Sequence, residues 1–461
     1  MAFKFVYPDK DNTIGNITYY ERATTASNLG YNELLYVYKA FDANSNIGVV
    51  RSLLSFSYDG FNSWFSSSNV SFVTSSVTYC LKLTHNPNLE PNKELAESFD
   101  LTIYPLTRFW DEGTGMSWSD LGYSNWKYAT STTEWTLTGS DYYNLVSASQ
   151  HFDSGIENLY VDVTDIVEYQ RENNNYGFVV KLSEDCETNS NEYETKSFWS
   201  RHTHYLDYRP RLELWYDDHL DDCRGCYEFN TTGSLYVYNI SKGQFANFVG
   251  TTSASALTAS LYNNSDISSA TFSSSFALEW LQDGVYKYQV SLPLTSSLTD
   301  LADEYSGKIT LYEYIFDENG GELKSNNTVF AYENPPYLQV DPLRVIIQTN
   351  IKNVYKQGER AKIEIFMREK WPQKGTVRSL QKERYSDIIY PSGSYRLEYA
   401  NTSEVLVPFG EYSLLSSDQI SNYFWLDTNS LAQGFSYKLR FRFYYGKEIF
   451  EPDDYWTFKV I

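Results

Sequence analysis

The stretch Lys438-Leu439-Arg440-Phe441-Arg442-Phe443 alternates charged and apolar side chains, which places its apolar residues on one face of an extended chain. Similar alternation recurs at 34–38, 101–104, 212–216 and 235–238. Clusters of Ser, Asn, Gly and Asp, which favour turns, separate these segments. Helical spacing is rare; it occurs at 163–171, with Asp162 or Thr164 as the expected N-cap, and at 298–305. The sequence therefore predicts an all-β fold built from sandwich strands.

Composition narrows the class of protein. The chain has 461 residues, enough for about three domains at roughly 150 residues each. Hydrophobic residues make up 42% and charged residues 21%, as expected of a globular rather than a disordered chain. The net charge of −22 argues against a nucleic-acid partner, because phosphate binding requires clustered Lys and Arg. Apolar runs are too short for a membrane span.

The start of the chain and its cysteine content bear on the compartment. Residues 1–9 contain no long apolar stretch, so we expect no secretory signal and synthesis in the cytoplasm. Four cysteines cannot supply a disulfide framework for a chain of this length, which fits a reducing compartment. Cys80 lies in an apolar strand pattern and is expected to be a core thiol.

The chain divides into tandem β-sandwich modules. The first is predicted at 1–216, and an acidic linker follows at 217–226. A small sandwich rich in Ser, Thr and Asn is predicted at 227–334, where Asn334-Pro335-Pro336 interrupts the chain. Residues 337–461 have the size of one immunoglobulin-like sandwich.

Five pieces of the first module occur in a recognisable order. They are Asn28-Leu29-Gly30 before a strand, Arg51-Ser52-Leu53-Leu54, Trp110-Asp111-Glu112-Gly113, the pair 161–167 and 175–181, and Arg209-Pro210-Arg211-Leu212. In this order they resemble the DNRLRE-type, disaggregatase-related β-sandwich, a module similar to carbohydrate-binding modules. The resemblance implies a jelly-roll-like fold for 1–216. Such modules occur in secreted bacterial proteins and in phage-associated ones.

The last module has a looser similarity. Residues 393–399 and 424–427, within 337–461, are similar in their general residue pattern to immunoglobulin-like accessory domains of tailed-phage structural proteins. The family's secreted members carry a signal peptide, which we do not expect here. Taken together, the two resemblances imply a virion protein that is released when the host lyses.

Metal ligands are considered at three places. His219, Cys223 and Cys226 could bind Zn²⁺ with Cys186, His202 or His204 as a fourth ligand, or they could belong to a linker without metal. Alternation would put His202 and His204 on one strand face, as a paired-imidazole site or as a solvated strand end. Asp9, Asp11 and Asn12 offer oxygen ligands for Ca²⁺. None of these patterns is complete, so no metal or cofactor is expected.

Catalysis has little support in the sequence. The five histidines do not accompany a Gly-x-Ser-x-Gly elbow, and no glycine-rich phosphate loop occurs. Asp111 and Glu112, or Asp217 and Asp218, could form a glycosidase pair, but adjacent acids do not reveal the separation required across a sugar. We therefore expect a protein that is not an enzyme.

Aromatic residues make up 17% of the chain, with 42 Tyr among them. Tyrosine and tryptophan favour protein interfaces and sugar-binding faces, although strands also bury them in cores. The candidate binding aromatics are Trp118, Trp126, Tyr142, Tyr143 and Trp199. Protein interfaces are favoured over sugar platforms, because interfaces also need mixed polar contacts.

These observations lead to one main functional hypothesis. The chain is expected to be a non-enzymatic structural protein of a tailed-phage virion, at a neck, tail, fibre or capsid-decoration position. Its partners would be other virion proteins and further copies of itself. The alternative is a glycan-binding adhesin or receptor-binding accessory protein that holds a host-surface glycan. A polysaccharide depolymerase ranks third.

Overall fold

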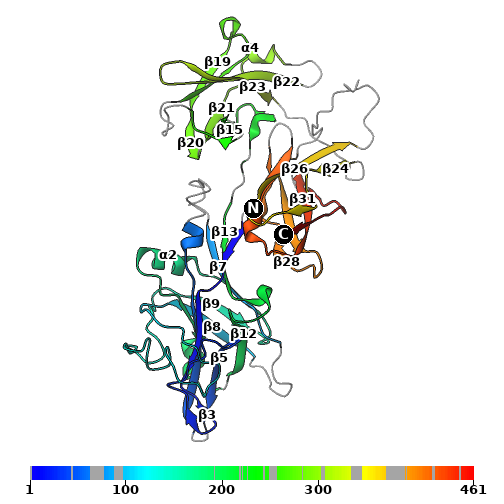
Figure 1. The fold of residues 1–461 in the computed structure, drawn as a ribbon. Helices are drawn as coiled ribbons and strands as arrows, with labels where there is room; N and C mark the ends of the chain where they lie inside the picture. The colour runs from blue at the N-terminus through cyan, green and yellow to red at the C-terminus, as the bar shows by residue number, and fades with distance from the viewer. Residues whose placement is uncertain are drawn as a thin grey trace. The chain divides into compact units, whose positions relative to one another are not determined.

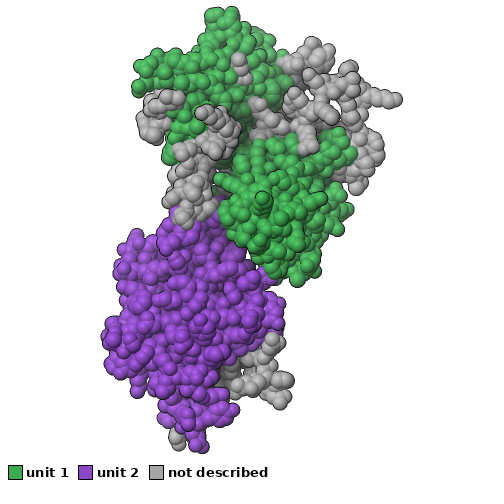
Figure 2. Space-filling model, viewed as in Figure 1, with its two compact units in different colours: residues 1–2, 65–75, 217–461 green, residues 3–64, 76–216 purple. Residues whose placement is uncertain are grey.

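The fold is seen in a computed structural model. It describes all residues except 1–2, 43–44, 63–76, 88–96, 192, 218–219, 221, 226, 242–243, 249–256, 283, 303–306, 334–344, 370–389, 391, 418–420 and 446–447. The chain forms two compact units (Figure 2), which are considered separately. The N-terminal unit comprises 3–64 and 76–216, and the C-terminal unit contains 217–461.

The two large sheets of the N-terminal unit are both antiparallel (Figure 1). The first has the strand order β1 (Phe3–Val6), β13 (Arg211–Trp215), β7 (Thr78–Leu83), β10 (Leu159–Asp162). The second has the order β12 (Tyr193–Trp199), β5 (Leu34–Phe41), β6 (Ile47–Ser55), β11 (Phe178–Leu182), β8 (Phe99–Pro105), β9 (Ala148–Phe152), and β2 (Lys10–Gly15) also pairs with β6. Because β1 pairs with β13, the two ends of the unit are joined in one sheet.

A long irregular segment, 106–147, covers the outer face of the second sheet. Its side chains Leu106, Trp110, Trp126 and Trp135 pack in one cluster with the sheet residues Leu53 and Val179. As a result, β11 is buried along its whole length instead of alternating between core and solvent. The segment contains only isolated bridges, turns and bends between the ends of β8 and β9.

Helices are few and short. The predicted helix at 163–171 is confirmed as α2 (Thr164–Glu172). Its N-cap is Val163, and Asp162 instead accepts a hydrogen bond from the Thr164 backbone N–H. In the described residues the further helices are residues 59–62, α3 (Glu184–Thr188), α4 (Ser296–Thr299) and the 3₁₀ turns Leu206–Tyr208, Cys223–Gly225, Ile267–Ser269, Glu411–Ser413 and Thr428–Ser430. In the part of the chain that is described, no helix has the length and apolar character needed to cross a membrane.

The C-terminal unit begins with two sheets drawn from 227–332. One has the order β14 (Tyr227–Glu228), β23 (Glu322–Tyr332), β22 (Lys308–Phe316), β18 (Thr258–Tyr262), β19 (Ser273–Ala277). The other has the order β15 (Thr232–Tyr238), β21 (Val285–Ser291), β20 (Glu279–Gln282). Side chains of both sheets, including Leu235, Tyr288 and Leu311, share one hydrophobic core.

Two further sheets come from 345–460. The first has the order β24 (Val345–Thr349), β26 (Arg360–Glu369), β30 (Asn422–Asp427), β29 (Ser416–Ser417). The second has the order β25 (Val354–Tyr355), β33 (Trp456–Val460), β31 (Ser436–Tyr445), β27 (Ser392–Tyr399), β28 (Val405–Val407), with β32 (Glu448–Phe450) beside β31. The described residues also contain two sheets of only two strands each. One pairs β3 (Thr18–Tyr19) with β4 (Arg22–Ala23), and the other pairs β16 (Ile240–Ser241) with β17 (Gln244–Phe245).

The predicted fold class is confirmed. The chain is all-β, with sandwich modules in tandem, jelly-roll-like first and immunoglobulin-like last. The alternating stretch at 438–443 lies within β31, where Leu439, Phe441 and Phe443 are buried. The limits drawn for the individual modules stay predictions.

A buried ionic network lies inside the C-terminal unit. Glu313 on β22 accepts hydrogen bonds from the Tyr288 hydroxyl (2.6 Å), the Asn327 amide (2.7 Å) and the Arg224 guanidinium (2.9 Å). Asp222 accepts from the backbone N–H of Arg224 at 3.0 Å, and its Oδ2 lies 3.4 Å from the guanidinium Nε of Arg224. Two carboxylates thus share one guanidinium, and burial raises the pKa of Asp222 to about 6 although the Arg224 charge opposes this shift.

The raised pKa of Asp222 predicts a pH-dependent stability. The folded protein keeps this proton at pH values where the unfolded chain, with a carboxyl pKa near 3.8, has lost it. The free energy of unfolding contributed by Asp222 therefore falls as pH rises from about 4 to about 6. Urea unfolding should show the wild type losing about 1–3 kcal/mol relative to Asp222→Asn over this range. A difference between the two proteins that does not change with pH would contradict this expectation.

Candidate functional site

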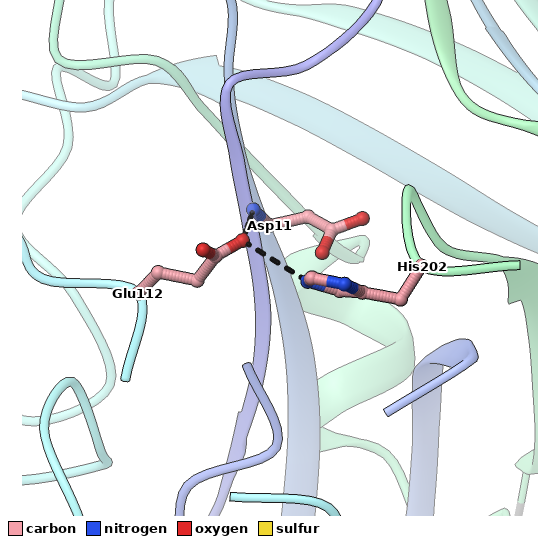
Figure 3. A group of neighbouring side chains, drawn as sticks. All are labelled: Asp11, Glu112 and His202. Carbon is pink, nitrogen blue, oxygen red and sulfur yellow. Dashed lines mark hydrogen bonds and ion pairs between the residues drawn. The ribbon is translucent and has the colours of Figure 1, made fainter. Parts of the chain in front are cut away.

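Three side chains from distant parts of the N-terminal unit meet at one place (Figure 3). Asp11 lies on β2, Glu112 lies in the segment after β8, and His202 lies in a turn after β12. One potential ligand atom from each lies within 4.8 Å of the other two. Strand β2 and the ends of β8 and β12 thus bring together residues separated by about a hundred positions or more.

Glu112 is held by the neighbouring Arg201. The guanidinium donates from Nε to Oε1 and from Nη2 to Oε2, both at 2.6 Å, which is a bidentate ion pair. Oε1 also accepts from the Asp11 backbone N–H at 2.9 Å. These contacts fix the orientation of the carboxylate at the junction of three chain segments.

Asp11 is the most deeply buried member, with 1% of its surface exposed. Its Oδ2 accepts from the backbone N–H of Arg201 at 2.6 Å. Burial raises the pKa of Asp11 to about 7, and the nearby negative charge of Glu112 acts in the same direction. The backbone hydrogen bond from Arg201 opposes the shift.

His202 forms the outer side of the site. Its imidazole stacks on Tyr31, with ring centroids 4.3 Å apart. Nε2 lies 3.5 Å from Glu112 Oε1 and has no hydrogen-bond partner among the described residues. Burial, followed by the positive charge of Arg201, lowers the pKa of His202. Because 17% of its side chain is exposed and Tyr31 is half exposed, solvent lies close to the site.

Asn28 organises the loops around these residues. Its amide nitrogen donates to the carbonyls of Glu112 and Ser124, both at 2.8 Å. Its Oδ1 accepts from the backbone N–H groups of Gly30 (3.2 Å) and Gly115 (2.9 Å). The packing is so close that a Cβ on Gly30 would lie 2.2 Å from the Glu112 carbonyl oxygen.

The residues considered as possible calcium ligands, Asp9, Asp11 and Asn12, do not converge. Asp9 is exposed before β2, while Asp11 is buried. The Asn12 side chain is already used, because Nδ2 donates to Ser124 and Oδ1 accepts from the Leu29 N–H at 3.0 Å. These three residues therefore do not form one oxygen-ligand site, and Asp11 instead belongs to the cluster with Glu112 and His202.

A paired-imidazole site would require His202 and His204 on one face of a strand. Strand β12 ends at Trp199, and 201–204 form a turn, so His202 and His204 do not share a strand face. His204 is 91% exposed and lies 3.4 Å from Glu33. Among the predicted acid pairs, the close partner of Glu112 is Asp11, not the adjacent Asp111. Asp217 is described, but Asp218 lies outside the described residues.

Of the three zinc candidates His219, Cys223 and Cys226, only Cys223 lies in the described residues. Cys223 is half-buried in a 3₁₀ turn, while His219 and Cys226 lie outside the described residues. Cys186 is buried in α3 and Cys80 in β7, as expected for a core thiol, and burial raises the pKa of Cys80 to about 11.

The candidate binding aromatics differ in exposure. Trp126 and Trp199 are buried, which leaves little of either ring for an external ligand. Trp118, Tyr142 and Tyr143 are half-buried. Tyr142 stacks on Tyr104, and Tyr143 stacks on Tyr169.

The exposed aromatic surface lies beside Trp199 and was not among the candidates. It consists of Tyr7, Tyr205, Leu206 and Tyr208, all exposed, and is called the Tyr205 surface below. The rings of Tyr205 and Tyr208 lie 5.6 Å apart and both contact Trp199. The run Tyr205-Leu206-Asp207-Tyr208 is the available sequence signal, since three of its four side chains are large aromatic or aliphatic groups and it follows a strand.

Comparison with known proteins gives little further information. No protein-family model matches the sequence, and no curated protein is similar to it. Among solved structures, the chain is weakly similar to the chicken CNTN1 FN1-FN3 domains, with 8% identity over 61% of this chain and 86% of that chain. The TM-score of 0.15 is too low for this similarity to support an argument about fold or function.

The close packing around Gly30 yields a prediction. Gly30→Ala should lower the free energy of unfolding of the N-terminal unit by about 1–3 kcal/mol, because the added methyl group overlaps the Glu112 carbonyl. Gly410→Ala is the control, since a Cβ there meets nothing within 4 Å. Chemical denaturation of both variants measures the effect, and equal stability of the two would contradict the packing argument.

Proposed function

We propose that this chain is a non-enzymatic structural protein of a tailed-phage virion, which assembles with other virion proteins through the Tyr205 surface. Three features support the proposal: tandem β-sandwich modules, a composition rich in tyrosine, and the resemblance of 1–216 to a module found in phage-associated proteins. The observation that carries it is the clustering of exposed aromatic rings on one turn of the N-terminal unit.

The Tyr205 surface has the character of a protein-binding patch. Tyr205 is 59% exposed and Tyr208 is 41% exposed, with Leu206 between them. The rings of both tyrosines pack against the buried ring of Trp199. Rigid aromatic rings with polar hydroxyl groups bury a large area at low entropic cost, which is typical of the residues that dominate binding energy.

Incorporation into particles tests the proposal. Tyr205→Ser/Tyr208→Ser should reduce the amount of this chain in purified virions by at least about tenfold, because loss of two central aromatics weakens an interface by more than about 1.4 kcal/mol. Tyr20→Ser is the matched control, since Tyr20 is 83% exposed and lies in the same unit. Quantitative mass spectrometry of particles measures the effect, and immunogold labelling of wild-type particles should show one regular position.

Absence of the wild-type chain from particles would reject the virion role. Equal incorporation of both variants would reject the Tyr205 surface as the docking site while leaving a virion role through another surface.

The second candidate function is glycan binding by the same surface. Exposed aromatic rings can stack on the apolar faces of sugars, and Tyr205 and Tyr208 offer two adjacent rings. In this case the purified wild type should be retained on a glycan array, the double variant should lose retention, and Tyr20→Ser should keep it. Absence of retention for the wild type on arrays of host-surface glycans would count against this function.

A further inference from the structure

We propose that Asp11, Glu112 and His202 bind a divalent transition-metal ion, with Zn²⁺ as the representative ion. The donor set is one imidazole nitrogen and two carboxylate oxygens, all within 4.8 Å of one another. The site is distinct from the Tyr205 surface, and the inference does not rest on the proposed function.

The spacing suits coordination. In a tetrahedral zinc site with bonds near 2.1 Å, ligand atoms lie roughly 3.4 Å apart. His202 Nε2 and Glu112 Oε1 are already separated by 3.5 Å. Asp11 faces the same point from β2 (Figure 3), so small side-chain rotations would complete a three-ligand site.

The histidine is oriented as a ligand. Its Nε2 is buried and has no hydrogen-bond partner in the described part of the chain, although it faces a carboxylate oxygen. The ring stacks on Tyr31, with centroids 4.3 Å apart, which holds the plane of the imidazole. When its proton is on Nδ1, Nε2 presents a lone pair toward the Glu112 carboxylate, and an ion between the two atoms would be bound by both.

The surrounding charge also favours a cation. Asp11 and Glu112 carry two negative charges when ionised, whereas Arg201 supplies one positive charge at contact distance. Arg201 holds both oxygens of Glu112, and Oε1 also accepts from the Asp11 N–H, so the carboxylate is fixed and Oε2 is the oxygen with a lone pair left for an ion. The half-exposed Tyr31 and the partly exposed His202 leave a route from solvent for the ion and for a fourth ligand such as water.

The donor types select the ion. Imidazole suits zinc and neighbouring transition metals, whereas Ca²⁺ and Mg²⁺ prefer oxygen ligands throughout. The ion would join β2, the segment after β8 and the turn after β12. Because the unfolded chain does not bring these ligands together, bound metal should stabilise the N-terminal unit.

Calorimetric titration of the chelator-treated full chain tests the proposal. The chain with Asp11, Glu112 and His202 intact should bind Zn²⁺ at this site with one ion per chain, and Ca²⁺ should not replace it. His202→Ala should weaken this binding by at least about tenfold. His204→Ala is the matched control, since that imidazole is 91% exposed two positions away, and it should bind as the wild type does.

Two measures keep the result interpretable. All titrations are made in a Cys223→Ser/Cys226→Ser background, so that thiols in the predicted linker cannot supply the signal. Asp11→Asn is the second variant, because it preserves side-chain shape and the hydrogen bond from Arg201; circular dichroism confirms that it folds, and it too should lose binding. The thermal midpoint should rise with Zn²⁺ in the background protein and stay unchanged in Asp11→Asn.

Absence of binding in the folded background protein would overturn the proposal. Undiminished Zn²⁺ affinity in both His202→Ala and Asp11→Asn would do the same, because the ion would then be held elsewhere.

Discussion

The local architecture of the N-terminal unit depends on the hydrogen bonds that the Glu112 carboxylate accepts from two distant segments of the chain. The carboxylate accepts hydrogen bonds from strand β2 and from the turn after β12, while the backbone carbonyl of the same residue is held by Asn28. A buried carboxylate is stable only when such donors replace its hydration. The three segments must therefore keep a fixed spacing, and the glycines around Asn28 are needed because the backbones approach too closely for side chains.

These hydrogen bonds explain how the irregular segment 106–147 can stay packed over one face of the second sheet. Segment 106–147 has few backbone pairings of its own and covers a sheet whose outer face is apolar. Long loops without regular structure are uncommon in compact domains and usually need specific anchors. Glu112 provides one anchor at the start of the segment. Arg108 provides another, because its ion pair to Asp141 at 2.5 Å joins the two ends of the segment.

The sequence predicts the strands well where one face is buried. The alternation at 438–443 and the apolar run of 34–38 both correspond to strands, β31 and β5. It cannot predict that β11 is buried on both faces, since the covering side chains come from 106–135 and carry no periodic signal. For the same reason Trp126 resembles a surface aromatic in the sequence but lies in the interior.

The candidate site shows a similar division. Asp11, Glu112 and His202 each attract attention singly because of their residue types, but each was grouped with its neighbours in sequence. Their true grouping depends on strand pairing between β2 and β6 and on where β12 ends. Such contacts between positions about a hundred residues apart leave no spacing pattern in a single sequence.

Two clusters in this chain place two carboxylates beside one arginine, and they differ in how the polar atoms around the carboxylates are satisfied. In the C-terminal unit, Glu313 receives donors from Tyr288, Asn327 and Arg224, so protein groups supply its polar contacts. In the N-terminal unit, the corresponding position beside Glu112 is taken by His202 Nε2, which lies 3.5 Å from Oε1 and has no hydrogen-bond partner among the described residues. Protein hydrogen bonds thus satisfy the carboxylate of the first cluster, whereas the second leaves a ligand atom without a partner in the described part of the chain. This difference is the reason that we propose a cation for the second cluster and none for the first.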